Sequence, residues 1–126
     1  MKTTEYLSIS EVLELHEMTI EKHGGKSGVR DMGLLESALL RCQSRYYNSL
    51  AEQGASLLQS LCMNHCFVDG NKRVALLSTI IFFKMNGHTL KVSNKEIVSF
   101  IVNDIIISKI DMEKISDWLS KKLNKL

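Results

Sequence analysis

The side chains of this sequence that could carry out chemistry gather in nine consecutive residues, 65–73, which read His-Cys-Phe-Val-Asp-Gly-Asn-Lys-Arg. His65 is the residue type best suited to accept a proton near neutral pH. Asp69 offers the hard carboxylate oxygens that Mg²⁺ prefers, and Gly70 lets the backbone approach a ligand closely. A base, a metal ligand and an open backbone together predict a phosphoryl or nucleotidyl transfer site.

The residues that follow this turn predict an anion site. A helix is expected to begin near residue 71, and the first N–H groups of a helix lack intrahelical partners and carry the positive end of its dipole. Lys72 and Arg73 stand in the first turn, where cations are electrostatically unfavourable. We therefore expect an anion, such as a phosphate group, to compensate the two cations.

A purely structural interpretation of these residues competes with the chemical one. His65 could cap the end of a helix, residues 69–71 could form an ordinary turn, and Lys72 and Arg73 could be solvated. Each of these features is common singly, whereas their joint arrangement within nine residues is less common. Both interpretations stay open on the residue types alone.

The neighbouring cysteines allow a third interpretation, a Zn²⁺ site. Cys62, His65 and Cys66 would lie close together on a helix, and Cys42 or His88 could supply a fourth ligand. Cys62 also continues the apolar stripe of its helix, and a free thiol in the core behaves as a small apolar side chain. We therefore interpret the cysteines as buried thiols.

Length and composition exclude several classes of protein. The chain has 126 residues, a mass of 14.3 kDa, 44% hydrophobic and 24% charged residues, and a formal net charge of +2. These values fit one globular domain covering residues 1–126 and argue against disorder, direct nucleic-acid binding and membrane binding. The longest uncharged apolar run, residues 74–83, is about half of a membrane span. Because the N-terminus has no signal-peptide core and the cysteines number three, we expect a reduced, cytoplasmic protein.

The pattern of apolar residues and helix caps predicts an all-α fold. The sequence contains no proline, so the strongest helix breaker is absent. Capping boxes begin at Ser8 and Ser93, and Asp31 and Asp111 are expected N-cap residues. Apolar residues at spacings of three and four follow these caps. The expected helices begin at or near Ser8, Asp31, Leu50, Asn71, Ser93 and Asp111.

Further details of the expected fold depend on particular segments. The fourth helix, residues 71–85, is apolar around nearly its whole circumference and is expected at the centre of the bundle. The third helix is expected to run to His65, residues 88–92 to form a short extended piece, and the last helix to bury Leu123. The β-branched run at residues 105–107 favours a strand, but helical spacings persist through it, so we predict a helix.

The stretch His-x-Phe-x-Asp-Gly-Asn-Lys-Arg at residues 65–73 resembles the active-site motif of Fic/Doc proteins, in its Doc (death-on-curing) form. Residues 28–39 read Gly-Val-Arg-Asp-Met-Gly-Leu-Leu-Glu-Ser-Ala-Leu and are similar to the family's upstream segment. The first and last expected helices also stand where Doc-like proteins have helices, so the resemblance covers nearly the whole chain. It implies a compact helical fold of the Fic/Doc type.

The resemblance implies a role for each residue of the motif. His65 would deprotonate a target hydroxyl, Asp69 would hold Mg²⁺, and ATP would supply the transferred group. Phe67 is expected to anchor the loop in the core and to take no part in the chemistry. Lys72 and Arg73 are also assigned to catalysis. The phosphates of ATP would be cradled by backbone and side-chain donors of Gly70, Asn71, Lys72 and Arg73.

Two departures from the standard Fic motif match the Doc form. Fic enzymes have Gly where this chain has Lys72 and a second Arg where it has Leu76, and they usually transfer AMP. Doc toxins resemble Fic enzymes but phosphorylate a threonine of elongation factor Tu, which halts translation. A lysine in the cradle without the second arginine would let the γ-phosphate face the base. The resemblance therefore implies a protein kinase, with AMP transfer and a catalytically inactive binding module as the alternatives.

The chain lacks the inhibitory Ser/Thr-x-x-x-Glu-Gly/Asn motif of many Fic proteins, since Leu15 follows the matching pair Ser10 and Glu14. Doc-like toxins resemble it in this respect and are inhibited by a separate small protein, so a Phd-like antitoxin is the expected partner. Cys66 replaces the proline that many relatives have after the histidine, which could loosen the loop without removing a catalytic group. No role is assigned to the other histidines, His16, His23 and His88.

Overall fold

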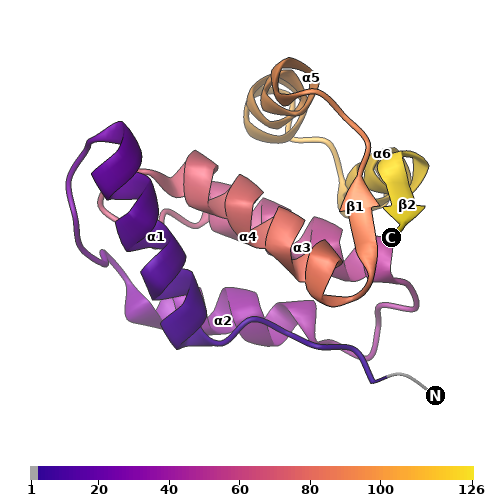
Figure 1. The fold of residues 1–126 in the computed structure, drawn as a ribbon, viewed down its shortest axis with the longest axis horizontal. Helices are drawn as coiled ribbons and strands as arrows, with labels where there is room; N and C mark the ends of the chain where they lie inside the picture. Colours follow the sequence, from indigo (N-terminus) through magenta and orange to yellow (C-terminus); the bar gives the residue numbers. More distant parts are fainter. Residues whose placement is uncertain (1–2) are drawn as a thin grey trace.

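Helices make up most of the described part of the chain, residues 3–126, in the computed structural model (Figure 1). The all-α prediction is confirmed, and the chain stays helical through residues 105–107, where α5 continues into a π-helix. In chain order the elements are α1 (Ile9–His23), α2 (Met32–Cys42), α3 (Leu50–Met63), α4 (Asn71–Met85), β1 (His88–Leu90), α5 (Asn94–Ser99), η1 (Phe100–Ile107), α6 (Met112–Lys122) and β2 (Leu123–Lys125).

Local capping decides where several of the helices begin. The Ser8 hydroxyl accepts a hydrogen bond from the Glu11 N–H at 3.1 Å, and the Glu11 carboxylate accepts one from the Ser8 N–H at 3.0 Å. This complete capping box starts α1, as predicted. Asp31 and Asp111 each accept a hydrogen bond from the N–H three residues later and start α2 and α6.

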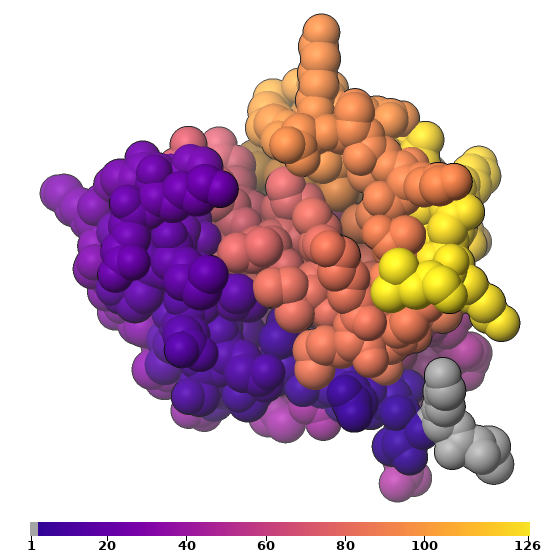
Figure 2. Space-filling model, in the orientation of Figure 1, coloured from indigo at the N-terminus to yellow at the C-terminus, as the bar shows by residue number. Residues whose placement is uncertain are grey.

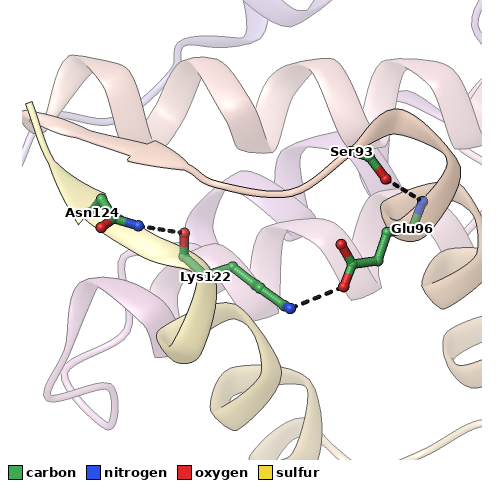
Figure 3. Close-up of polar contacts among 4 residues, drawn as sticks. All are labelled: Ser93, Glu96, Lys122 and Asn124. Atoms are coloured by element: carbon green, nitrogen blue, oxygen red, sulfur yellow. Dashed lines mark hydrogen bonds and ion pairs between the residues drawn. The ribbon is translucent and has the colours of Figure 1, made fainter.

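The second predicted capping box is only half formed. The Ser93 hydroxyl accepts a hydrogen bond from the Glu96 N–H, but the Glu96 carboxylate pairs with the Lys122 ammonium at 2.9 Å instead of accepting from the Ser93 N–H (Figure 3). Lys122 reaches it because the Lys91 N–H donates to the Lys122 carbonyl and so joins the two chain segments. A charged partner delivered by the tertiary fold competes with the local N–H donor for this carboxylate.

The centre of the fold is the pair α3 and α4, which α1, α2 and α6 surround (Figure 1). The predicted central place of α4 is confirmed, since it packs against α3 in the middle of the fold, but α4 is not buried around its whole circumference. One side of α4 packs in the core, whereas the other reaches the surface between α1 and α5 (Figure 2). The reason is that α3 covers only one side of α4. The partly exposed apolar residues of α4 include Leu76, Leu77, Ile80 and Ile81.

The structure corrects the predicted C-terminal ends of two helices, α3 and α6. α3 ends at Met63, two residues before His65. α6 ends at Lys122, and Leu123 pairs with Leu90 in a two-stranded antiparallel sheet of β1 and β2. The extended piece predicted at residues 88–92 is confirmed for residues 88–90, but its partner strand was not predicted. Within residues 3–126, no helix combines the length and the apolar character that crossing a membrane requires.

Candidate active site

The candidate base, His65, lies in the loop between α3 and α4 and is exposed. Its backbone is in the left-handed region, with φ at +49°, which few residues other than glycine adopt. The Arg30 side chain holds this conformation from outside the loop. Its Nε donates to the His65 carbonyl at 2.6 Å and its Nη2 donates to the Asn64 carbonyl at 3.1 Å. Local strain at this position is thus supported by a tertiary contact.

The backbone of the segment before α2 frames the same loop. The N–H groups of Arg30 and Asp31 both donate to the Cys66 carbonyl, at 2.8 and 3.0 Å, and the Val68 N–H donates to the Gly28 carbonyl at 3.1 Å. An antiparallel bridge joins Val29 to Phe67. The two motifs, residues 28–39 and 65–73, therefore form one unit around His65.

Phe67 and Asn71 close the loop from within. Phe67 is 1% exposed, which fits the predicted role as a core anchor. The Asn71 side chain accepts from the Phe67 N–H and donates to the Phe67 carbonyl, both at 3.0 Å. Because both polar atoms of the Asn71 amide are engaged in this way, its side chain shapes the loop, and its backbone N–H is one of the first N–H groups of α4, which lack intrahelical partners.

Asp69 presents an exposed carboxylate beside the start of α4. Its Oδ2 accepts from the Lys26 N–H at 3.2 Å and its Oδ1 accepts from the Gly70 N–H at 2.8 Å. These two hydrogen bonds, and the charges of Arg73 and Lys26, hold the pKa of the Asp69 carboxyl below its usual range. The carboxylate is therefore ionised at neutral pH. A Cβ at Gly25 would lie 2.8 Å from Oδ2, and the backbone there has φ at +116°, so glycine allows this approach without strain.

The start of α4 is open to an anion. Gly70, its N-cap, has left-handed backbone with φ at +76°, and no side chain in the described residues caps the helix. Lys72 and Arg73 are exposed in the first turn. An ionised carboxylate, uncapped N–H groups and two cations at one helix start fit the phosphates and the metal ion of a Mg²⁺-nucleotide. In that arrangement Asp69 would hold the ion, whose charge would neutralise phosphate oxygens.

Comparison with known proteins assigns the family. The model of the Fic/DOC family matches residues 6–83, which include α1 to α3, the whole of this loop and α4 as far as Phe83. The chain belongs to the Fic/Doc family. A protein named "Toxin Doc" from Mycolicibacterium smegmatis is 34% identical over 123 residues, which are 93% of this chain and 92% of that protein. One named "Protein kinase doc" from Escherichia phage P1 is 35% identical over 86 residues, 65% of this chain and 68% of its own length. This Fic/Doc chain is thus Doc-like.

The sequence analysis missed one residue of this Fic/Doc site, His16. The structure buries His16 to 2% exposure and brings its Nε2 to 2.7 Å from the Asp69 carbonyl oxygen. Its ring stacks on Phe67, with 3.9 Å between the ring centroids. One signal could have found it: His16 stands four residues from both Val12 and Ile20 on the buried face of α1, where a polar side chain needs a partner.

The cysteines of the Fic/Doc domain are buried thiols, as predicted. Burial raises the pKa of Cys42 and of Cys62 to about 12 and raises that of Cys66 as well. All three are therefore protonated at neutral pH. In residues 3–126, no three side chains of His, Cys, Asp or Glu are grouped so that they could hold a metal ion, so the zinc interpretation has no structural support.

Proposed function

We propose that this chain is a Doc-like toxin that transfers the γ-phosphate of ATP to a serine or threonine hydroxyl of a protein. The observation that carries the proposal is the ionised Asp69 at the uncapped start of α4. It lies four residues after His65, whose backbone Arg30 holds. The names of the two relatives, a toxin and a protein kinase, support the same activity. In broader terms, the chain is a transferase of the Fic/Doc family.

In the proposed reaction His65 accepts the proton of the target hydroxyl. The freed oxygen forms a bond to the γ-phosphorus, and the bond from that phosphorus to the oxygen bridging it to the β-phosphate breaks, so that ADP leaves. Lys72, Arg73 and the first N–H groups of α4 bind the phosphate oxygens on which negative charge gathers. A magnesium ion at Asp69 would supply further charge neutralisation.

Two residues of α4 favour transfer of the γ-phosphate over transfer of AMP. Lys72 places a flexible ammonium in the cradle where the standard Fic motif has glycine. Leu76, one turn later, is apolar and packs against the core where that motif has a second arginine. Compared with the standard Fic motif, this phosphate-binding cradle has fewer fixed cationic groups to bind the three phosphates of ATP. AMP transfer is the alternative outcome of the experiment below.

The proposed target is elongation factor Tu and the proposed partner is a Phd-like antitoxin. The target follows from the resemblance to Doc, and its phosphorylation would stop translation in the cytoplasm. An external inhibitor is proposed because the one near match to the Fic inhibitory motif is incomplete, and its Glu14 is exposed on α1, away from the buried face that carries His16. Co-purification with the product of an adjacent small gene would identify the partner.

The experiment that tests the proposed function compares two labels. Purified chain, Mg²⁺ and elongation factor Tu are incubated with ATP labelled at the α- or the γ-phosphate. We expect label only from the γ position. Label from the α position would replace the kinase proposal with AMP transfer. If neither label reaches elongation factor Tu but the γ label reaches another protein of a cell lysate, the target is wrong and the kinase stands. No transfer to any protein would contradict the transferase proposal.

Arg30 offers a separate prediction, because it supports the backbone of His65 without belonging to the loop. We expect Arg30→Ala to lower kcat about tenfold, since His65 can then leave its left-handed conformation, and to lower the free energy of unfolding by only about 1–2 kcal/mol. Arg30→Lys keeps the charge but replaces the two-pronged donor with a single ammonium, so an intermediate kcat is expected. Steady-state kinetics and urea unfolding measure both effects. An unchanged kcat in Arg30→Ala would show that the frame is dispensable.

A further inference from the structure

We propose that His16 is a positioning residue of this site, which holds the peptide bond between Asp69 and Gly70 and thereby fixes the Asp69 carboxylate at the start of α4. The inference deepens the proposed function and rests on it for the effect on phosphate transfer. His16 belongs to α1, and the peptide that it holds is 53 residues further along the chain.

The direction of the hydrogen bond is defined by its acceptor. A carbonyl oxygen can only accept, so the His16 Nε2 carries the hydrogen and donates it to the Asp69 carbonyl across 2.7 Å. This donor role is the same whether the ring is neutral with hydrogen on Nε2 or fully protonated. The ring is also 2% exposed and stacked on Phe67, so it is fixed on its face as well as at its edge. His16 is therefore built to hold the loop and is buried too deeply to meet a protein target.

Without the hydrogen bond from His16, the plane of the Asp69–Gly70 peptide would rotate easily. Glycine adopts positive and negative φ about equally well, so Gly70 by itself does not select its left-handed conformation. Rotation of the Asp69–Gly70 peptide plane would move both the Asp69 carbonyl and the Gly70 N–H. That N–H donates to the Asp69 carboxylate at 2.8 Å. The His16 ring lies next to the same residue, since a Cβ at Gly70 would be 3.6 Å from its Nε2.

All three oxygens of Asp69 are held by different parts of the fold. His16 of α1 donates to the carbonyl oxygen, the Gly70 N–H donates to Oδ1, and the Lys26 N–H, in the segment after α1, donates to Oδ2. Without the hydrogen bond from His16, two hydrogen bonds to the Asp69 carboxylate remain, but the backbone of Asp69 is free to rotate. A metal ligand whose supporting contact is lost typically binds its ion about 10 to 100 times more weakly.

The test uses two amide variants that differ by one methylene. His16→Gln places an amide donor near the position of Nε2, whereas His16→Asn carries the same donor on a side chain too short to reach the Asp69 carbonyl. The affinity for Mg²⁺ together with a non-hydrolysable ATP analogue is measured by calorimetry. We expect His16→Asn to bind at least about tenfold more weakly than the parent, and His16→Gln to bind within about threefold of the parent. The amide hydrogen of Gly70, followed by NMR in the unliganded chain, should exchange faster in His16→Asn alone. The Mg²⁺ concentration for half-maximal transfer should rise in parallel, with the KM for the protein target unchanged.

Each result decides the proposal. Equal Gly70 exchange and equal nucleotide binding in His16→Asn and His16→Gln would overturn it. Equal losses in both variants, matched by equal falls in the midpoint of thermal unfolding, would mean that His16 only supports the core, which also overturns it. If either amide variant fails to fold, His16→Phe, which keeps the ring on Phe67 and lacks the donor, is compared with the parent by the same two measurements. Failure of the parent to transfer phosphate, with the Gly70 difference intact, would count against the proposed function and leave the positioning role standing.

Discussion

Replacing His65 by alanine is expected to lower the rate of phosphate transfer by about 100-fold or more, which is the usual contribution of a general base. The reason is that the substitution removes the proton acceptor without touching Asp69 or the start of α4, so nucleotide binding should persist. Transfer of γ-labelled phosphate and nucleotide binding by calorimetry measure the two effects separately. Expression of the parent without an antitoxin is expected to arrest growth, and expression of His65→Ala is expected to be tolerated.

His88→Ala is the matched control for this prediction. His88 lies on β1, far along the chain from the loop, and its Nδ1 contacts the Asn86 carbonyl at 2.9 Å. This control is expected to keep the transfer rate within about twofold of the parent. If His65→Ala transferred phosphate as fast as the parent, His65 would not be the general base. If the variant arrested growth as the parent does while neither protein transferred phosphate, a non-enzymatic binding module would become the better explanation.

Replacing Gly54 by alanine is expected to lower the free energy of unfolding by about 2 kcal/mol, although alanine is a better helix former by about 1 kcal/mol. Gly54 lies on α3 where α4 crosses it, and an added Cβ would overlap the ring of Phe83. Phe83 is 0% exposed, so its ring has no free space into which it can move. Urea unfolding measures the change.

Two further variants make the prediction for Gly54 specific. Gly33→Ala, in the exposed first turn of α2, is the control and is expected to change the free energy of unfolding by less than about 1 kcal/mol. Phe83→Leu removes the ring that the new Cβ would strike. The double variant Gly54→Ala/Phe83→Leu should therefore be less destabilised than the sum of the two single variants. A neutral or stabilising Gly54→Ala would mean that α3 and α4 separate at little cost.

The sequence by itself determined the features that depend on neighbouring residues. The starts of α1, α2 and α6 were predictable because Ser8, Asp31 and Asp111 cap N–H groups only three residues away. The candidate site was recognisable for the same reason, since its base, its metal ligand and its cations fall within residues 65–73. Such short spacings are kept whatever the rest of the chain does, so a local pattern carries the information.

Some predictions failed where a distant segment supplied a competing partner. Glu96 leaves its capping box for the ammonium of Lys122, which the contact between Lys91 and Lys122 brings near. Leu123 leaves the last helix for pairing with Leu90. In both cases a local preference worth about 1 kcal/mol competes with a charge pair or a strand contact of similar size, and only the tertiary structure decides which is formed.

The contacts that hold the backbone of His65 and of Asp69 from outside the loop belong to the tertiary structure. Arg30 reaches the His65 carbonyl across 35 residues of sequence, and His16 reaches the Asp69 carbonyl across 53. Neither contact has a local signature, because each depends on how α1 and the segment before α2 pack against the start of α4. The residue types in the loop determine which chemistry is available, and the packing of helices around the loop holds those residues in one arrangement.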